Sequence, residues 1–106
     1  MSQSVRYSEY KQERLKNKEY AQAYLQAALE AYQEDRDRDA FLNALRDLAE
    51  AQGGVPEIAR RINKPKQSVY KALSENGNPR LDTLDAILNS LGFRLSIEPI
   101  SPPASR

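Results

Sequence analysis

Residues 54–73, GVPEIARRINKPKQSVYKAL, constrain the fold more than any other stretch, because they predict two short helices joined by a tight turn. Pro56 lies near the start of the first helix, where its missing N–H removes no hydrogen bond. Asn63 and Pro65 mark the break, since Asn tolerates a positive φ and Pro suits the first position of a new helix. The apolar face of the first helix consists of Val55, Ile58, Ala59 and Ile62.

The second of these helices has an inward face and a polar outer face. Val69, Ala72 and Leu73 face inward. The outer face consists of Lys66, Gln67, Ser68, Tyr70 and Lys71. This is the helix-turn-helix pattern, whose second helix enters the major groove of DNA with its N-terminal residues against base edges. The alternative is an ordinary pair of packed helices with a solvated polar face.

The distribution of charged residues along the chain favours DNA binding. Between residues 60 and 80 there are six basic residues and one acid, Glu75. Residues 1–52 carry eight bases and ten acids, whereas residues 53–106 carry eight bases and five acids. A DNA-binding surface needs local positive charge, so the overall net charge of +1 does not exclude one.

The loop after the second helix, residues 74–80, is rich in turn-forming residues and suits the DNA backbone. The alternative is a turn with no contact to a ligand. We expect Gln67 and Ser68 to read bases. We expect phosphates to be held by Lys66, Tyr70, Lys71, Asn78 and Arg80, and long-range attraction to come mostly from Arg60, Arg61 and Lys64. The predicted DNA-binding residues are Lys64, Lys66, Gln67, Ser68, Tyr70, Lys71, Asn76, Asn78 and Arg80.

Helical patterns account for most of the remaining chain. We expect helices over about 9–16, 18–32 and 39–51, and a last helix whose apolar residues run from Leu84 to Leu91 and which ends at Gly92. The stripe of Tyr20, Tyr24, Ala28 and Tyr32 indicates partial burial, with one edge left for a partner.

Residues 93–98, FRLSIE, alternate apolar and polar side chains with the period of a β-strand. No second strand is predicted, so the backbone groups of this one need a partner. The simplest partner is the same strand of a second copy, paired antiparallel about a twofold axis. The alternative is a strand that lies against its own domain. The predicted homodimer contacts are Phe93, Arg94, Leu95, Ser96 and Ile97.

The composition argues against an enzyme. The chain has no Cys and no His, so it lacks a cysteine nucleophile, the commonest general base and the commonest metal ligands. We expect no catalytic residue, no cofactor and no metal site. No apolar run approaches the ~18 residues that span a bilayer, and the first residues lack a signal-peptide core. We therefore expect a cytoplasmic protein with no membrane partner.

Several runs resemble the addiction-module antidote (antitoxin) family of prophage-type DNA-binding proteins. They are Phe41–Asp47, Gly53-Gly54, Ser68–Ser74, Asn76–Pro79 and Leu91–Ser96. The resemblance covers roughly residues 7–98. The family in turn resembles phage-repressor-like (Xre-type) and HigA-like proteins. The turn differs, because the family usually has Gly-Leu-Ser where this chain has Asn63-Lys64-Pro65.

The resemblance implies an all-α, phage-repressor-like helix-turn-helix domain of five to six helices, here with one short C-terminal strand. We expect an N-terminal helical extension over 1–35, the DNA-binding domain with its dimerisation strand over 36–98, and a disordered tail over 99–106.

The implied function is a transcriptional repressor that binds an operator in double-stranded DNA, neutralises a small RelE/HigB-like toxin and autoregulates its operon. The alternatives are a stand-alone prophage regulator without a toxin, and a helical interaction adaptor.

Overall fold

A computed structural model of the chain describes residues 2–101, with the side chains of residues 9–101. This part of the chain is all-α and contains no strand. Its six helices are α1 (Ser2–Leu15), α2 (Lys18–Asp35), α3 (Arg38–Ala51), α4 (Val55–Arg61), α5 (Lys66–Leu73) and α6 (Leu81–Ser90). The all-α helix-turn-helix fold is therefore as predicted.

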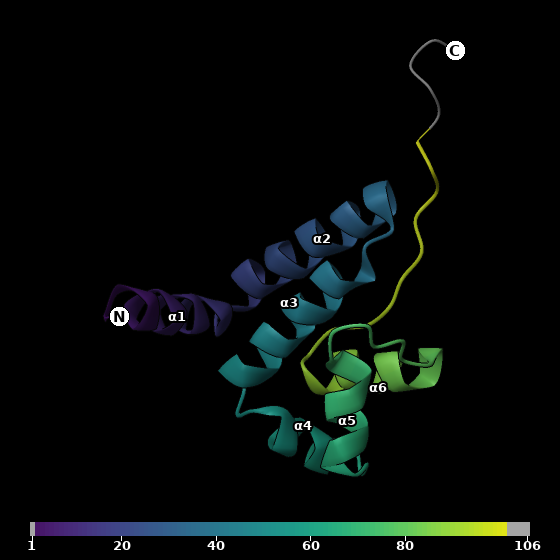
Figure 1. The fold of residues 1–106 in the computed structure, drawn as a ribbon. Coiled ribbons are helices and arrows are strands. Elements are labelled where there is room, and N and C mark those ends of the chain that lie inside the picture. Colours follow the sequence, from purple (N-terminus) through teal and green to yellow (C-terminus); the bar gives the residue numbers. More distant parts are fainter. Residues whose placement is uncertain (1, 102–106) are drawn as a thin grey trace.

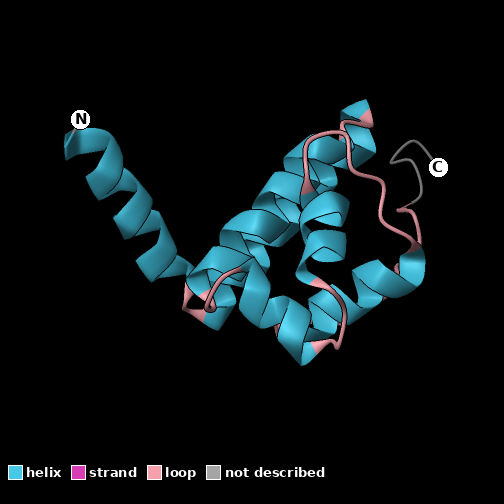
Figure 2. Cartoon of the chain, turned by 60° about the horizontal axis from the view of Figure 1, so that its bottom comes forward, coloured by secondary structure: helices cyan, strands magenta, loops and turns pink. Residues whose placement is uncertain are grey.

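The helices are arranged around α3. Figure 1 shows α2 lying along α3, with α1 projecting from the end of this pair and α4 and α5 on the far side of it. Figure 2, in which the bottom of the molecule in Figure 1 is brought forward, shows that α1 extends away from the short C-terminal helices. Because α3 contacts α1, α2, α4 and α5, it is the element that connects the two halves of the molecule.

A single aliphatic core runs through both halves. Leu45, Leu48 and Ala49 of α3 are completely buried, as are Ile58 of α4 and Val69 of α5. The buried cluster consists of Leu15, Ala21, Leu25, Leu42, Ala44, Leu45, Leu48, Ala49, Val55, Ile58, Ala59, Val69, Leu73, Ile87, Leu88 and Leu91. Three members of the predicted stripe, Tyr20, Tyr24 and Ala28, are partly buried and pack against this core. Tyr32 is partly buried as well but is not packed against the core cluster.

The turn of the helix-turn-helix has the predicted chemistry. Asn63 adopts a φ of 57°, in the left-handed region that Asn tolerates. Pro65 is the N-cap of α5, one residue before the first helical position predicted for it, and α5 begins at Lys66. Asn63-Lys64-Pro65 thus forms the turn where the family usually has Gly-Leu-Ser. Pro56 lies in the first turn of α4, as predicted. Ala59 is buried where α4 and α5 pack together.

Two boundary predictions were wrong. The first helix starts at Ser2 rather than near residue 9, because no Pro or Gly precedes Leu15 to interrupt it. The second continues to Asp35, where Arg36 ends it with a φ of 61°.

The predicted strand over 93–98 was also wrong. Residues 93–101 have no secondary structure, because an isolated segment has no neighbouring strand to bond within one chain. Phe93 packs against the core, but Leu95 is 42% exposed and Ile97 is 97% exposed, so neither is buried as an inward strand face would be. Residues 99–101 are exposed, and the rest of the predicted disordered tail lies outside the described residues.

Candidate nucleic-acid interface

The recognition helix α5 presents the polar face that its sequence predicts. Val69 and Leu73 are completely buried and anchor the helix, and Ala72 is partly buried. Tyr70 is 49% exposed, and the other predicted outward residues, Lys66, Gln67, Ser68 and Lys71, are exposed as well. Because no side chain caps α5, its first backbone N–H groups are left for other acceptors.

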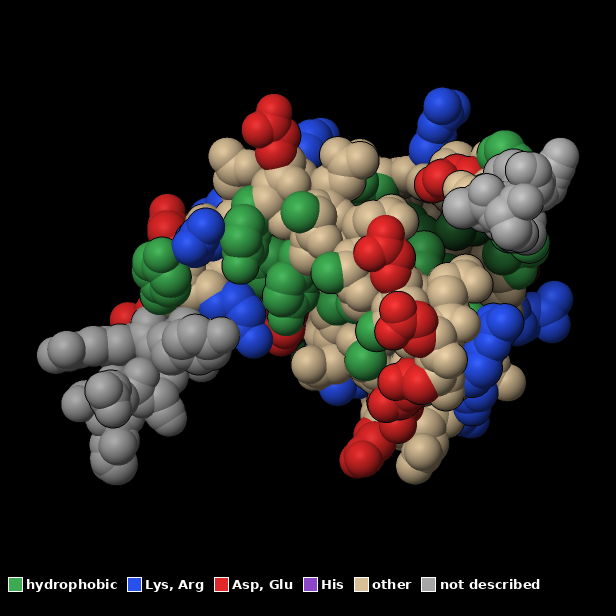
Figure 3. Space-filling view, turned by 90° about the horizontal axis from the view of Figure 1, so that it is seen from above, with side chains coloured by type: hydrophobic (Ala, Val, Ile, Leu, Met, Phe, Trp, Pro, Cys, Tyr) green, Lys and Arg blue, Asp and Glu red, His purple; other side chains and the backbone are tan. Residues whose placement is uncertain are grey.

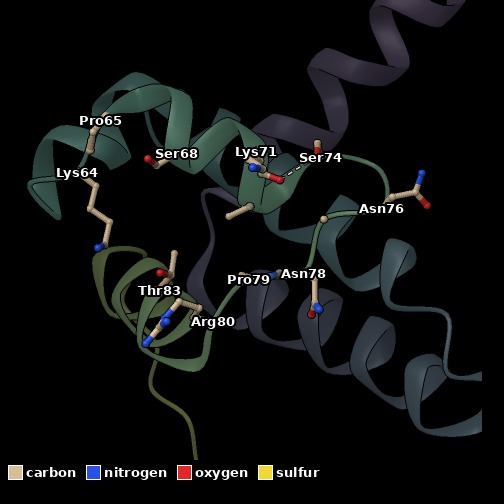
Figure 4. A pocket seen from close by; sticks show the side chains of 12 residues that line it. Lys64, Pro65, Ser68, Lys71, Ser74, Asn76, Asn78, Pro79, Arg80 and Thr83 are labelled. Carbon is tan, nitrogen blue, oxygen red and sulfur yellow. Dashed lines mark hydrogen bonds between the residues drawn. The ribbon is translucent and has the colours of Figure 1, made fainter.

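A groove of about 630 Å³ lies between α5, the 74–80 loop and the start of α6. None of the residues that line it is acidic: Lys64, Pro65, Ser68, Lys71, Ala72, Ser74, Asn76, Gly77, Asn78, Pro79, Arg80 and Thr83. Figure 4 shows Lys64 and Arg80 approaching each other at one end, beside Thr83, and Asn78 beyond Pro79. A groove lined by hydroxyls, amides and three cations suits an anionic ligand such as phosphate.

The structure brings most of the predicted DNA-binding residues together. Those that line the groove are Lys64, Ser68, Lys71, Asn76, Asn78 and Arg80. Lys66, Gln67 and Tyr70 do not line it and lie on the exposed face of α5 beside it. The side chain of Asn76 points away from the groove in Figure 4. Lys64, Lys66 and Lys71 make no ion pair within the described part of the chain.

The groove wall formed by the 74–80 loop is fixed by α3. Arg38 Nε donates to the carbonyl oxygen of Gly77 at 2.7 Å, and the Asn76 backbone N–H donates to Asp39 Oδ1 at 2.9 Å. Asn76 has a φ of 67°, which suits Asn in a tight turn. The loop thus has a defined backbone conformation before any ligand binds.

Gly77 is needed where this loop crosses the end of α5. A Cβ at this position would overlap the carbonyl oxygen of Ala72 and approach that of Ser74 to 2.8 Å. Both atoms belong to backbone, which yields less readily than a flexible side chain. The close approach therefore requires a residue without a side chain.

Arg46 of α3 holds the C-terminal end of the recognition helix. Its guanidinium donates through Nη1 to the carbonyl oxygen of Leu73 and through Nη2 to Asn43 Oδ1 at 2.8 Å. A cation at a helix C-terminus satisfies a free carbonyl and opposes the negative end of the helix dipole. Arg46 thereby fixes the orientation of α5 relative to α3.

Two of the cations counted in the basic segment, Arg60 and Arg61, share one carboxylate partner on their own helix. Hydrogen bonds from Arg60 and then Arg61 lower the pKa of Glu57, which Arg60 Nη2 contacts at 2.6 Å and Arg61 Nε at 3.1 Å. Arg61 also donates to the backbone oxygens of Gln52 and Ser90, at 3.0 and 3.1 Å. Arg61 thus joins α4 to the ends of α3 and α6, and its charge is less available for long-range attraction than the sequence suggests.

One carboxylate lies near the cationic end of the groove. Burial acts to raise the pKa of Asp82, but the Thr83 backbone N–H and the charges of Arg80 and Lys64 outweigh it, so the pKa is lowered. Arg80 Nε lies 3.4 Å from Asp82 Oδ1, and both side chains are largely exposed. An exposed pair of this kind is weak, so an incoming phosphate can compete for Arg80.

The sequence did not predict the roles of Arg38, Asp39 and Arg46, which hold the 74–80 loop and α5 in place. Asp37 caps α3 by accepting the Asp39 N–H at 3.0 Å, which leaves the Asp39 carboxylate for the Asn76 N–H. Arg46 belongs to a run that resembles the family, which was the one available signal. Their partners lie 27 to 39 residues away in sequence, so periodicity carried no information about them.

The described residues contain no helix that is long and apolar enough to cross a membrane. They also contain no cluster of three or more acidic, His or Cys side chains arranged to hold a metal ion.

Comparisons with known proteins identify the family. Residues 7–99 match the family described as "Probable addiction module antidote protein". An uncharacterized protein of Haemophilus influenzae is 34% identical over 86 residues, which cover 81% of this chain and 84% of that protein. No solved structure matches. The match over nearly the whole chain confirms the resemblance read from the sequence, and the chain belongs to the addiction module antidote family.

Proposed function

We propose that this chain is a sequence-specific DNA-binding repressor that also neutralises a small protein toxin. The observation that carries the first half is the acid-free groove beside the exposed polar face of α5. A recognition helix needs polar side chains at the major groove and cations or free N–H groups at the flanking phosphates. Both are present on one side of the molecule.

The residues divide into two roles. Gln67 and Ser68, in the first turn of α5, read base edges, where a side-chain amide can pair with adenine. Lys66, Tyr70 and Lys71 hold the phosphates on either side of the helix. Lys64, Asn78 and Arg80 bind a further phosphate in the groove.

A DNA titration tests this proposal. The chain should bind the DNA upstream of its own gene more tightly than a scrambled duplex of the same length. With Lys64, Lys66, Lys71 and Arg80 on phosphates, the slope of log K against log salt should be about −3 to −4 per bound chain. Equal binding to both duplexes would contradict sequence-specific recognition. No binding even at low salt would contradict any DNA binding and would favour the helical interaction adaptor.

The second half of the proposal follows from the family, because an antidote implies a toxin. We place the toxin contact on the α1–α2 surface, at Tyr10, Arg14 and Tyr20. Tyr10 is 58% exposed, and the Arg14 guanidinium lies 5.3 Å from its ring and 4.5 Å from the ring of Tyr20. Exposed Tyr and Arg side chains are enriched at the centres of protein interfaces. This surface lies away from α5, so DNA and toxin can be bound together (Figure 1).

The product of the neighbouring gene is the probe for this contact. A RelE/HigB-like toxin should bind the wild-type chain, and Tyr10→Ala should weaken that binding at least tenfold without changing DNA affinity. Tyr32→Ala is the matched control, because Tyr32 makes a similar pair with Arg36, at 5.3 Å, near the other end of α2. An equal effect of both variants would count against the placement. A neighbouring product that does not bind at all would favour a stand-alone regulator.

A further inference from the structure

The loop beside the recognition helix contains the pair Asn76-Gly77, and Asn followed by Gly occurs once in the sequence. In such a pair the glycine has no side chain to hinder its backbone nitrogen from approaching the carbonyl carbon of the Asn side chain. The Asn76 side chain is exposed, and Figure 4 shows that it points away from the groove. Its amide makes no hydrogen bond to the described part of the chain, so nothing in the fold holds this group back from reaction.

The turn that contains the pair keeps the reacting atoms apart. The Gly77 N–H donates to the Ser74 carbonyl oxygen at 2.8 Å. Asn76 has a φ of 67°, whereas Glu75 does not have a positive φ. These features match a type II turn, whose third residue has a ψ of about 0°. At this ψ the Gly77 nitrogen eclipses the backbone nitrogen of Asn76, whereas closure of a five-membered ring requires it to lie on the side of Cβ.

Two residues of α3 hold the turn in this conformation. Arg38 Nε donates to the Gly77 carbonyl oxygen at 2.7 Å, and Asp39 Oδ1 accepts the Asn76 N–H at 2.9 Å. These contacts lie on either side of the Cα–C bond of Asn76, which is the bond that must rotate before the ring can close. Rotation about it cannot keep both contacts and the hydrogen bond to Ser74.

We propose that Asn76 is a deamidation site that α3 keeps closed, and that it reacts when the 74–80 loop opens away from Arg38 and Asp39. In the open loop the Gly77 nitrogen forms a bond to Cγ of Asn76, and the Cγ–Nδ2 bond breaks. The side-chain amide leaves as ammonia and takes up the proton that the Gly77 nitrogen loses. Water then opens the succinimide at one of its two carbonyl carbons, which leaves aspartate or isoaspartate at position 76.

Neither product restores the closed loop. Isoaspartate places an additional carbon in the main chain between the groups that bind Asp39 and Arg38, so the loop no longer matches both. Both products add a carboxylate close to that of Asp39, in the lining of a groove that has no acid. A negative charge here opposes phosphate. This consequence rests on the proposed DNA binding, and it makes opening of the loop an irreversible route to lower DNA affinity.

Mass spectrometry of the full-length chain tests the closed state. After incubation at mildly alkaline pH, trypsin releases peptide 72–80, and fragmentation assigns the reacted residue. Asn78 in the same peptide is the internal control, because Pro79 has no N–H and cannot attack in this way. Asn76 of the native chain should react at least roughly tenfold more slowly than in concentrated urea, where the turn is lost. Equal rates would overturn the proposal.

Variants of α3 test whether local opening controls the rate. Arg38→Met and Asp39→Ala each remove one contact to the loop, so both should accelerate the reaction of Asn76 several-fold while helical circular dichroism is kept. Leu25→Ala is the matched control, because it destabilises the core far from the loop. Its urea midpoint should fall with little change in rate. An equal acceleration by Leu25→Ala, or none by either α3 variant, would overturn control by α3.

A separate titration tests the consequence for DNA. The deamidated chain, separated from the unreacted chain by ion exchange, should bind every duplex several-fold more weakly. Full affinity in a chain with Asn76 converted would overturn this loss. The mass measurements involve no DNA, so a failure of the proposed DNA binding would not alter them.

Discussion

The helices on the two sides of the α3–α4 turn begin in different ways. In the N-terminal half, Asn17 accepts the Tyr20 N–H at 2.9 Å at the start of α2, and Asp37 caps α3 in the same manner. In the C-terminal half, α4, α5 and α6 begin without a side-chain cap, at Gly54, Pro65 and Arg80. A capped N-terminus has used some of its N–H groups, whereas an uncapped one keeps them for a ligand.

Charge follows the same division. Figure 3, which views the side opposite α4 and α5, shows a row of acidic side chains, whereas the groove beside α5 has none. The short C-terminal helices, seven to ten residues long, would be marginal alone and depend on α3 for their orientation. The comparison indicates that the N-terminal half supplies rigidity and the C-terminal half supplies free polar groups.

Gly77→Ala is the most severe test of whether the C-terminal helices and their loop depend on this packing for their orientation. Its Cβ would overlap backbone oxygens at the end of α5, so the loop and α5 must separate. We expect a loss of roughly 3 kcal/mol of unfolding free energy, the upper range for overpacking. Urea denaturation measures it, with Asn78→Ala, an exposed neighbour, as the control. A Gly77→Ala protein as stable as wild type would mean that the loop is not held as described.

Arg46→Met should be the next largest change. It removes the charged donor to the Leu73 carbonyl while keeping the aliphatic part of the side chain. We expect a loss of roughly 2 kcal/mol in stability, since a hydrogen bond from a charged group is involved. Arg60→Met is the matched control, because its partner Glu57 is on the surface of the same helix and such pairs contribute little. Equal effects of the two variants would contradict a special role for α3.

Gln67→Ala should separate specific from non-specific DNA binding. A bidentate amide–adenine pair contributes about 1–3 kcal/mol, so operator affinity should fall about tenfold while affinity for scrambled DNA stays the same. Anisotropy titrations against both duplexes measure this. Gln33→Ala, an exposed Gln on α2, should change neither. An equal loss on both duplexes would make Gln67 a positioning residue.

Lys71→Ala should have the smallest effect and the least sequence dependence. Loss of one phosphate contact should lower affinity for every duplex several-fold and reduce the salt slope by about one unit. Lys16→Ala removes a cation from the N-terminal half, where it pairs with Glu13 at 3.3 Å, and should leave the slope unchanged. An unchanged slope for Lys71→Ala would remove it from the phosphate contacts.

Much of the fold could be predicted because its information is local. The apolar spacing of α4 and α5, the Asn63 turn and the Gly92 stop each depend on residues a few positions apart. The polar side chains on the outer face of the recognition helix could be predicted for the same reason. The strand was wrong because alternation describes a conformation that needs a second strand, which one copy does not contain.

The sequence by itself therefore determined the helices, the helix-turn-helix, the basic character of its second half and the family. Only the tertiary structure decided which of those residues form a groove and which are occupied elsewhere. Arg60 and Arg61 turned out to be bound to Glu57, whereas Arg38 and Arg46 hold the loop and the recognition helix. The reason is that an arginine reaches any acceptor within about a side-chain length, and which acceptors come that close depends on how distant segments pack.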